Sequence, residues 1–323
     1  MYETLLTRFS SEHPCWTAEL LERAGEETEG LSSLADAGLL RECGGVYALT
    51  DAGQAEFERA AAEMYLSERP AESAEYSAQK LMTTDLWLEM ERCNLQRWGI
   101  KRYFFRPQID VRPALGGNDL FSLSGGTLRW NYTAHSDYCA MTETHPLVSI
   151  DERRPELPDA AALEAWNKLP AAPLGIDMLL LCDYDFENYL DFRGHPGDPM
   201  RLINADRFAF SAANNVNDQL GIIGRYHLWL AELRHLRIPG FLDSDSHEQG
   251  SVNWLIFFAA TQKEAEDEAQ RLRELGSVLI APANPMEIWT LSLESLKKLA
   301  PRQEVIWDVL PAAGISVFRS LQR

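Results

Sequence analysis

Two segments near the N-terminus, LSSLADAGLL (31–40) and VYALTDAG (46–53), decide the fold of the first part of this 323-residue chain. The first segment, like residues 16–24, predicts a short helix. Gly44-Gly45 lies between two short extended pieces and indicates the turn of a β-hairpin. After Thr50 a further helix is predicted, because apolar residues recur at the spacing of one buried helix face: Phe57, Ala60, Ala61 and Met64.

This order of features resembles the winged helix-turn-helix superfamily. The resemblance rests on Leu31, Leu34 and 37–40, on the glycine-containing wing, and on 47–50 followed by Gly53. It covers about one fifth of the chain and predicts a winged helix-turn-helix over residues 1–66. It implies that the helix ending near Ala37 corresponds to the recognition helix, which enters the major groove in DNA-binding members. It implies a fold rather than a function.

The charge of this region argues against ordinary DNA binding. The recognition helix would begin after three carboxylates, Glu26, Glu27 and Glu29, which would face phosphates. Residues 1–80 hold 16 acidic residues against six Lys or Arg, and the whole chain has a net charge of −19. Two interpretations stay open, namely a DNA contact and a winged helix used for packing or for binding a protein.

A basic segment follows the acidic one. Residues 92–112 carry six arginines and lysines against Asp110. Cations alternate with aromatic residues between 97 and 106, a combination that suits stacking on bases and neutralising phosphates. The candidate nucleic-acid contacts are therefore Arg97, Lys101, Arg102 and Arg106. The alternative is that this segment docks on the acidic N-terminal domain of its own chain.

The middle of the chain is predicted to connect two domains. Residues 67–99 comprise a linker around Pro70 and a long helix, whose apolar stripe is Met82, Leu86, Met90 and Cys93. Such a stripe serves core packing or pairing with a second copy, so a homodimer is one expectation. Residues 100–133 contain short aromatic and β-branched runs separated by glycine pairs, which predict a short β-meander.

The C-terminal part, residues 160–323, alternates between strand and helix patterns. The predicted strands are 178–182, 252–260, 277–281, 305–309 and 315–318. The predicted helices are 216–237, one opened by the capping box Thr261–Glu264, and one that begins at 284–287. Successive β-α-β units indicate an α/β domain with a largely parallel sheet, within a mixed body spanning 100–323. The helix at 216–237 carries a basic face that could meet the acidic domain, with Arg225, His227, Arg234, His235 and Arg237.

Ligands bind outside the carboxyl ends of strands in open parallel sheets. If the predicted strands are neighbours, four polar residues would line one crevice: Asp183, Asp185, Thr261 and Asn284. Two carboxylates at a strand end are also able to hold Mg²⁺ and orient a phosphate, so Asp183 and Asp185 are the candidate metal ligands of an enzyme. The alternative is that both carboxylates stabilise the first turn of a short helix.

Other features restrict the function classes. No apolar run approaches the roughly 20 residues of a membrane span, and no export signal is recognisable. The five cysteines form no CxxC pair and suit a reducing cytoplasm. Common nucleotide and hydrolase motifs are absent. We therefore expect a cofactor-free cytoplasmic regulator without a membrane partner, whose body senses a small molecule or partner. The alternatives are a Mg²⁺-dependent enzyme and an interaction module with an acidic head.

Overall fold

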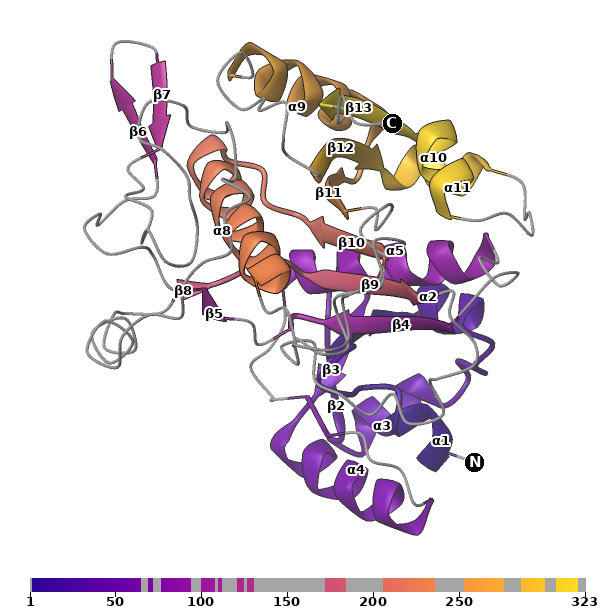
Figure 1. The fold of residues 1–323 in the computed structure, drawn as a ribbon. Coiled ribbons are helices and arrows are strands. Elements are labelled where there is room, and N and C mark those ends of the chain that lie inside the picture. The colour runs from indigo at the N-terminus through magenta and orange to yellow at the C-terminus, as the bar shows by residue number, and fades with distance from the viewer. Residues whose placement is uncertain are drawn as a thin grey trace, which may run out of the picture. The chain divides into compact units, whose positions relative to one another are not determined.

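The computed structural model describes residues 2–64, 69–71, 77–93, 100–107, 110–111, 121–124, 127–130, 172–183, 206–235, 253–275, 286–299 and 306–318. The chain divides into two compact units. The N-terminal unit comprises Met1–Leu95 together with Ala300–Arg302, and the C-terminal unit comprises Gln96–Leu299 and Gln303–Arg323. The protein belongs to the mixed α/β class, which confirms the expected fold class (Figure 1).

The N-terminal unit combines short helices with a small antiparallel sheet. In chain order its elements are α1 (Tyr2–Leu6), β1 (Cys15–Thr17), α2 (Ala18–Arg23), α3 (Leu31–Asp36), β2 (Leu40–Cys43), β3 (Val46–Leu49), α4 (Asp51–Glu63) and α5 (Ala78–Arg92). The sheet order is β1-β3-β2. β2 and β3 form the predicted hairpin, whose turn residues Gly44 and Gly45 have φ angles of 60° and 81°. Two consecutive positive φ angles are the reason for glycine at both positions.

Large side chains fill the core of this unit. Phe9, Trp16, Leu21, Leu49 and Phe57 are all at most 1% exposed. The indole nitrogen of Trp16 donates to the carbonyl oxygens of Arg8 and His13, at 2.8 and 3.0 Å. The polar atom of this buried ring is therefore satisfied, as buried polar groups must be.

Helix α5 is part of the N-terminal unit. Leu88 lies in the same core cluster as Trp16 and Phe57, and Trp87 packs against that cluster. The Trp87 ring also stacks on His13 with a centroid separation of 4.4 Å. The compact unit accordingly runs to Leu95, whereas the sequence interpretation ended the first domain at residue 66.

The C-terminal unit is built on a six-stranded sheet with the order β13-β12-β11-β10-β9-β4. These strands are β4 (Ile100–Phe105), β9 (Met178–Asp183), β10 (Asp206–Ser211), β11 (Asn253–Ala259), β12 (Met286–Ser292) and β13 (Gly314–Phe318). β10, β11 and β12 are parallel to one another. β13 joins one side antiparallel, and β9 and β4 join the other side antiparallel. The sheet is therefore mixed, with parallel pairing confined to the three central strands.

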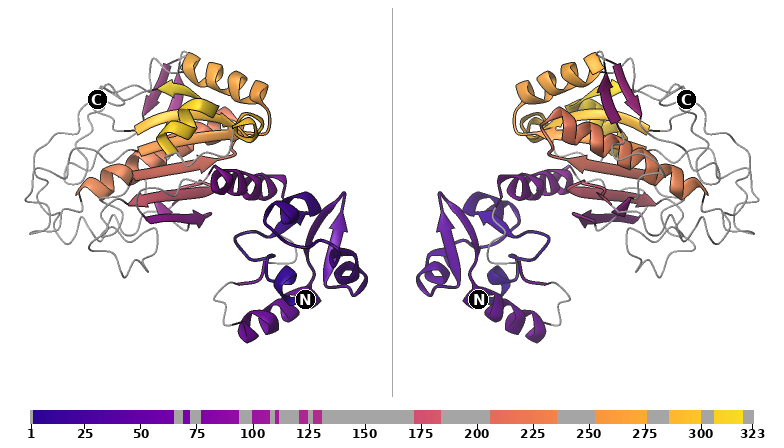
Figure 2. Two further views of the ribbon diagram at one scale, coloured as in Figure 1. Left: turned by 90° about the vertical axis from the view of Figure 1, so that its right-hand side faces the viewer. Right: turned by 90° about the vertical axis from the view of Figure 1, so that its left-hand side faces the viewer.

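Two long helices cross one face of this sheet. α8 (Val216–His235) connects β10 to β11, and α9 (Gln262–Leu275) connects β11 to β12. Figures 1 and 2 show α8 lying along the strands on one side. Thr290 on β12 donates to the carbonyl oxygen of Ala265 on α9, at 2.9 Å. Successive crossovers of one hand place both helices on the same face.

Smaller elements complete the unit. β6 (Phe121–Ser124) and β7 (Thr127–Trp130) pair antiparallel with each other, whereas β4 joins the six-stranded sheet, so these strands do not form the single meander expected over 100–133. β5 (Asp110–Val111) pairs with β8 (Ala172–Pro173). α10 (Leu293–Lys298) and α11 (Ile306–Ala313) lie between β12 and β13 along the chain.

Three expectations for the C-terminal unit were wrong or incomplete. The helix expected from residue 284 is instead strand β12, in which every residue from Met286 to Ser292 is buried. Burial in the sheet centre outweighs the local helix-start signal. The strand expected at 305–309 is helix α11, with Val309, Leu310 and Ala313 buried at helical spacing. β10 was missed, although β9, β11, β13 and both crossover helices were predicted.

Gly53 gives a direct test of the N-terminal fold. A methyl group at this position would lie 2.0 Å from the carbonyl oxygen of Leu39. Replacement of glycine by alanine normally stabilises a helix by about 1 kcal/mol. We predict that Gly53→Ala instead destabilises the protein by about 1–3 kcal/mol, because of this overlap. Urea unfolding measures the change, and Gly45→Ala, which has open space but a φ of 81°, separates backbone strain from overlap.

Candidate functional sites

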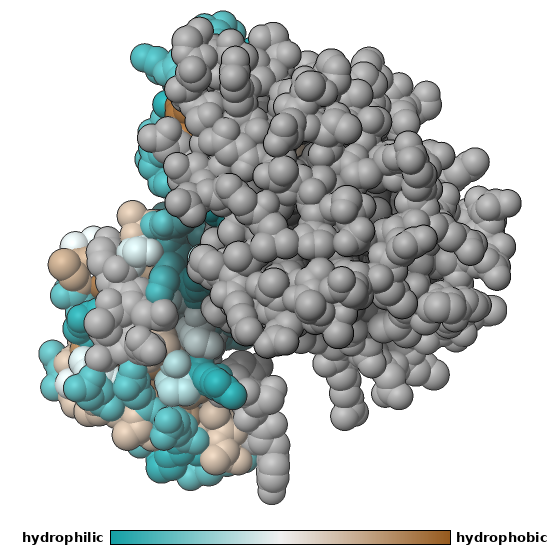
Figure 3. All heavy atoms as spheres, turned by 60° about the vertical axis from the view of Figure 1, so that its left-hand side comes forward, coloured by the Kyte–Doolittle hydropathy of each residue, from teal (hydrophilic) through white to brown (hydrophobic). Residues whose placement is uncertain are grey.

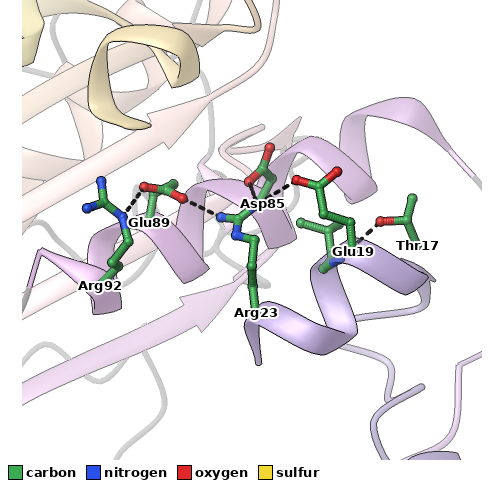
Figure 4. A network of polar contacts seen from close by, with 7 residues as sticks. Thr17, Glu19, Arg23, Asp85, Glu89 and Arg92 are labelled. Carbon is green, nitrogen blue, oxygen red and sulfur yellow. Dashed lines mark hydrogen bonds and ion pairs between the residues drawn. The ribbon is translucent and has the colours of Figure 1, made fainter. Parts of the chain in front are cut away.

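Ion pairs join the α2–α3 region, defined as residues 18–36, to α5 (Figure 4). Arg23, the last residue of α2, reaches Asp85 and Glu89 on α5 with N···O distances of 2.7 and 2.5 Å. Arg92 holds the other oxygen of Glu89 at 2.6 Å. The Glu89 side chain is only 3% exposed, and two guanidinium groups compensate its buried charge.

The charges that remain on the α2–α3 region are acidic. Arg23 is the one Lys or Arg between residues 18 and 36, and α5 carboxylates neutralise it. Glu26 forms an ion pair with Arg8 at 2.5 Å. Five further carboxylates are exposed, namely Glu19, Glu22, Glu27, Glu29 and Asp36, and Glu19 also lies 3.9 Å from Arg23. Ser32 and Ser33 on α3 are exposed among them, and Arg41 on β2 is an exposed cation near this region in the sequence.

The surface of the described residues has few exposed hydrophobic side chains that could form a docking face. In the part of the face that Figure 3 colours by hydropathy, hydrophilic residues are interspersed with weakly hydrophobic ones and no broad hydrophobic patch is visible. Among the described residues, Met64 is the large hydrophobic side chain classed as exposed, at 40%. Charge is therefore the feature of the α2–α3 region that a partner would recognise.

The Arg23 network predicts a coupled stability effect. Arg23→Met leaves the buried Glu89 with one cation fewer, so we expect a loss of about 1–3 kcal/mol in the free energy of unfolding. Glu89→Gln in the Arg23→Met background should recover part of this loss, because the amide carries no charge. Urea unfolding of the two single variants and the double variant gives the coupling energy. Additive effects would contradict a direct interaction.

The predicted crevice does not form as expected, because β9 runs antiparallel to β10. Cys182 of β9 pairs with Asp206, the first residue of β10. Asp183 therefore lies at the edge where β10, β11 and β12 begin. Thr261 follows the other end of β11, so a strand length of roughly 20 Å separates the two residues along the sheet. Asp185 and Asn284 lie outside the described residues, as does the side chain of Asp183.

The sheet edge near Thr261 is occupied by the protein's own groups. Thr261 and Glu264 form the predicted capping box, with bonds of 3.0 and 3.3 Å. The carboxylate of Glu294 accepts from the backbone N–H of Gln262 at 3.0 Å, which is where an anionic ligand would bind a helix N-terminus. Lys298 lowers the pKa of Glu294 by hydrogen bonding, and the Gln262 N–H acts in the same direction.

The basic candidates fall on the strand at the other side of the sheet. Lys101 and Arg102 belong to β4, but their side chains lie outside the description, and so does Arg97. Arg106 follows β4 and is half-buried, with a φ of 45°. Its backbone N–H donates to the carbonyl oxygen of Asp177 at 2.8 Å. Tyr103 and Phe105 stack on one face of the strand with centroids 6.5 Å apart, as strand alternation predicts.

A buried carboxyl group joins α8 to α9. Gln219 on α8 donates through its side-chain nitrogen to Glu268 on α9, and Arg271 forms an ion pair with the same carboxylate. Burial raises the pKa of Glu268, while Gln219 and Arg271 act in the opposite direction. Because Glu268 is 8% exposed, removal from water is the larger effect.

Glu268 should therefore make stability depend on pH. A raised pKa means that the folded protein holds the proton more tightly than the unfolded chain does. The stability it contributes is present below the ordinary carboxyl pKa of 4.5 and is lost as pH rises through the folded value. We predict that the stability of the wild type relative to Glu268→Gln falls as pH rises above 4.5, measured by urea unfolding. Asp267→Asn, an exposed neighbour, should show no such trend; an equal trend would contradict the assignment.

Arg225 belongs to the basic face that the sequence predicts on α8. Its side chain is half-buried and its guanidinium lies beside Gly175 and Gly221. The side chains of the other members of that face, His227, Arg234, His235 and Arg237, lie outside the description. The sequence feature that could have indicated the half-buried Arg225 is Gly221, a glycine inside a helix one turn before the arginine.

The described residues contain no group of three or more His, Cys, Asp or Glu side chains arranged to hold a metal ion. Among them, no helix combines the length and apolar character required to cross a membrane. Comparison of the chain with protein-family models, with curated proteins and with solved structures found no match.

Proposed function

We propose that this protein is a regulatory protein whose N-terminal unit is a winged helix-turn-helix that binds a basic surface of another protein. The observation that carries the proposal is the neutralisation of Arg23 by Asp85 and Glu89. This contact leaves a helix-turn-helix region whose other charged groups, between residues 18 and 36, are carboxylates.

The order of elements supports the winged-helix part of the proposal. α2 and α3 follow one another before the β2–β3 hairpin, and β1 pairs with β3 to close a three-stranded sheet. Ser32 and Ser33 leave the polar side of α3 open to solvent. In DNA-binding winged helices the corresponding helix enters the major groove.

The charge favours a protein partner over DNA. A DNA-binding surface gains affinity when Lys and Arg displace counterions from phosphates, and each carboxylate at the contact opposes this gain. Glu27 and Glu29 are exposed immediately before α3, and the Arg23 cation is engaged with α5. A basic protein surface is electrostatically complementary to this arrangement.

Fluorescence anisotropy with a labelled ten-residue oligolysine peptide tests the proposal. We expect the peptide to bind the full-length protein at about 50 mM salt and to bind more weakly at about 200 mM. Replacing Glu27 and Glu29 together by lysine should weaken binding about three- to tenfold, because two attractive exposed pairs become repulsive.

The control is Glu58→Lys, which changes an exposed charge on α4. If this variant weakens binding as much as the Glu27/Glu29 change, the peptide senses net charge alone and the proposal fails. A labelled DNA duplex should bind more weakly than the peptide at both salt concentrations. Tighter duplex binding that is lost when Lys101, Arg102 and Arg106 become alanine would instead favour a DNA contact through the basic strand.

A further inference from the structure

We infer that Arg225 on α8 forms the anchor of a binding site for a small anionic ligand that carries a carboxylate or phosphate group. The inference concerns the C-terminal unit alone and does not depend on the proposed protein contact. The Arg225 guanidinium group is half-buried, and no carboxylate among the described residues forms an ion pair with it.

Two glycines make the space for the guanidinium. Gly175 precedes β9 and has a φ of 80°, and a methyl group there would lie 3.0 Å from Nη2 of Arg225. Gly221 lies one turn before Arg225 on α8, and a methyl group there would lie 3.0 Å from Nη1. Glycine inside a helix costs about 1 kcal/mol relative to alanine. Glycine at position 221 therefore lowers helix stability, and it leaves room beside the terminal nitrogens of Arg225.

The hydrogen bonds of Arg225 do not use its terminal nitrogens. Among the described residues its one hydrogen bond runs from Nε to the carbonyl oxygen of Leu174, at a long 3.3 Å. It forms no ion pair there. Asp218, two turns earlier on α8, acts on it only through longer-range attraction. The charge is thus partly withdrawn from water without a compensating carboxylate, which is an unfavourable state.

Burial lowers the pKa of Arg225, with the attraction of Asp218 acting in the opposite direction. The guanidinium still stays charged, because the ordinary pKa of an arginine lies far above neutral pH. A neighbouring arginine shows the usual solution, since Arg271 on α9 is paired with Glu268. Arg225 carries the same cationic group, but none of the residues that the structure describes forms an ion pair with it.

The geometry of the donors indicates the ligand class. A guanidinium presents parallel N–H groups that match the two oxygens of a carboxylate or of a phosphate. The half-buried position strengthens such a contact relative to one in bulk water. The apolar neighbours Leu174 and Ile222 are buried, so the charged group of the ligand is the part that Arg225 recognises.

Isothermal titration calorimetry with inorganic phosphate and, separately, with succinate tests the site. The full-length protein is used, with sodium chloride at matched ionic strength as the reference. We expect one of the two anions to bind and to raise Tm by about 5 °C at 100 times Kd. Phosphate binding would identify a phosphate ligand, and succinate binding would identify a carboxylate ligand.

Three variants locate the binding. Arg225→Met should abolish it and, without anion, should not lower Tm, because an unpaired charge has been removed. Arg225→Lys keeps the charge but loses the paired donors, and should weaken binding about tenfold. Gly221→Ala should weaken binding by crowding Nη1 while adding helix propensity.

Arg271→Lys is the matched control and should bind as the wild type does, because the substituted ammonium group would keep the ion pair with Glu268. Equal binding by the wild type and Arg225→Met would overturn the inference. So would the absence of any response to both anions beyond that to sodium chloride. A lower Tm of Arg225→Met without anion would show that the guanidinium is already compensated, which also contradicts it.

Discussion

The ion pairs between Arg23 and the α5 carboxylates Asp85 and Glu89 are the contact on which the N-terminal unit depends. Glu89 is almost fully buried, and it is tolerated there because Arg23 and Arg92 both contact it. The same contact has two consequences. It ties α5 to α2, and it neutralises the sole Lys or Arg of residues 18–36. One arginine therefore contributes both to the stability of this unit and to the acidic character of its α2–α3 surface.

In the C-terminal unit, strand direction decides which polar groups share an edge. β9 runs antiparallel to β10, so Asp183 lies at the edge where the central parallel strands begin. At the opposite edge, Glu294 already accepts from the first turn of α9. A ligand site at that edge would have to displace a carboxylate of the protein. Arg225 lacks such an internal partner among the described residues.

The limits of sequence reasoning follow from the range of the interactions. Local signals predicted the hairpin at Gly44-Gly45, the capping box at Thr261 and the Gly125-Gly126 turn, because each depends on residues close in the chain. Strand direction and neighbours depend on long-range pairing, so β10 was missed and the predicted crevice placed Asp183 and Thr261 at the same edge, where the structure has them at opposite edges. β12 shows the same limit, since burial overrode its helix-start residues. The Arg23–Glu89 contact joins residues 66 positions apart and leaves no local pattern.

We propose that the α2–α3 region meets a basic protein partner, and hydrogen–deuterium exchange of the full-length protein with and without saturating oligolysine peptide would locate that contact. We expect slower exchange in peptides covering residues 20–43, with α4 and residues 100–106 unchanged. Protection confined to α4 or to 100–106, or protection of 20–43 by duplex DNA in place of the peptide, would contradict it.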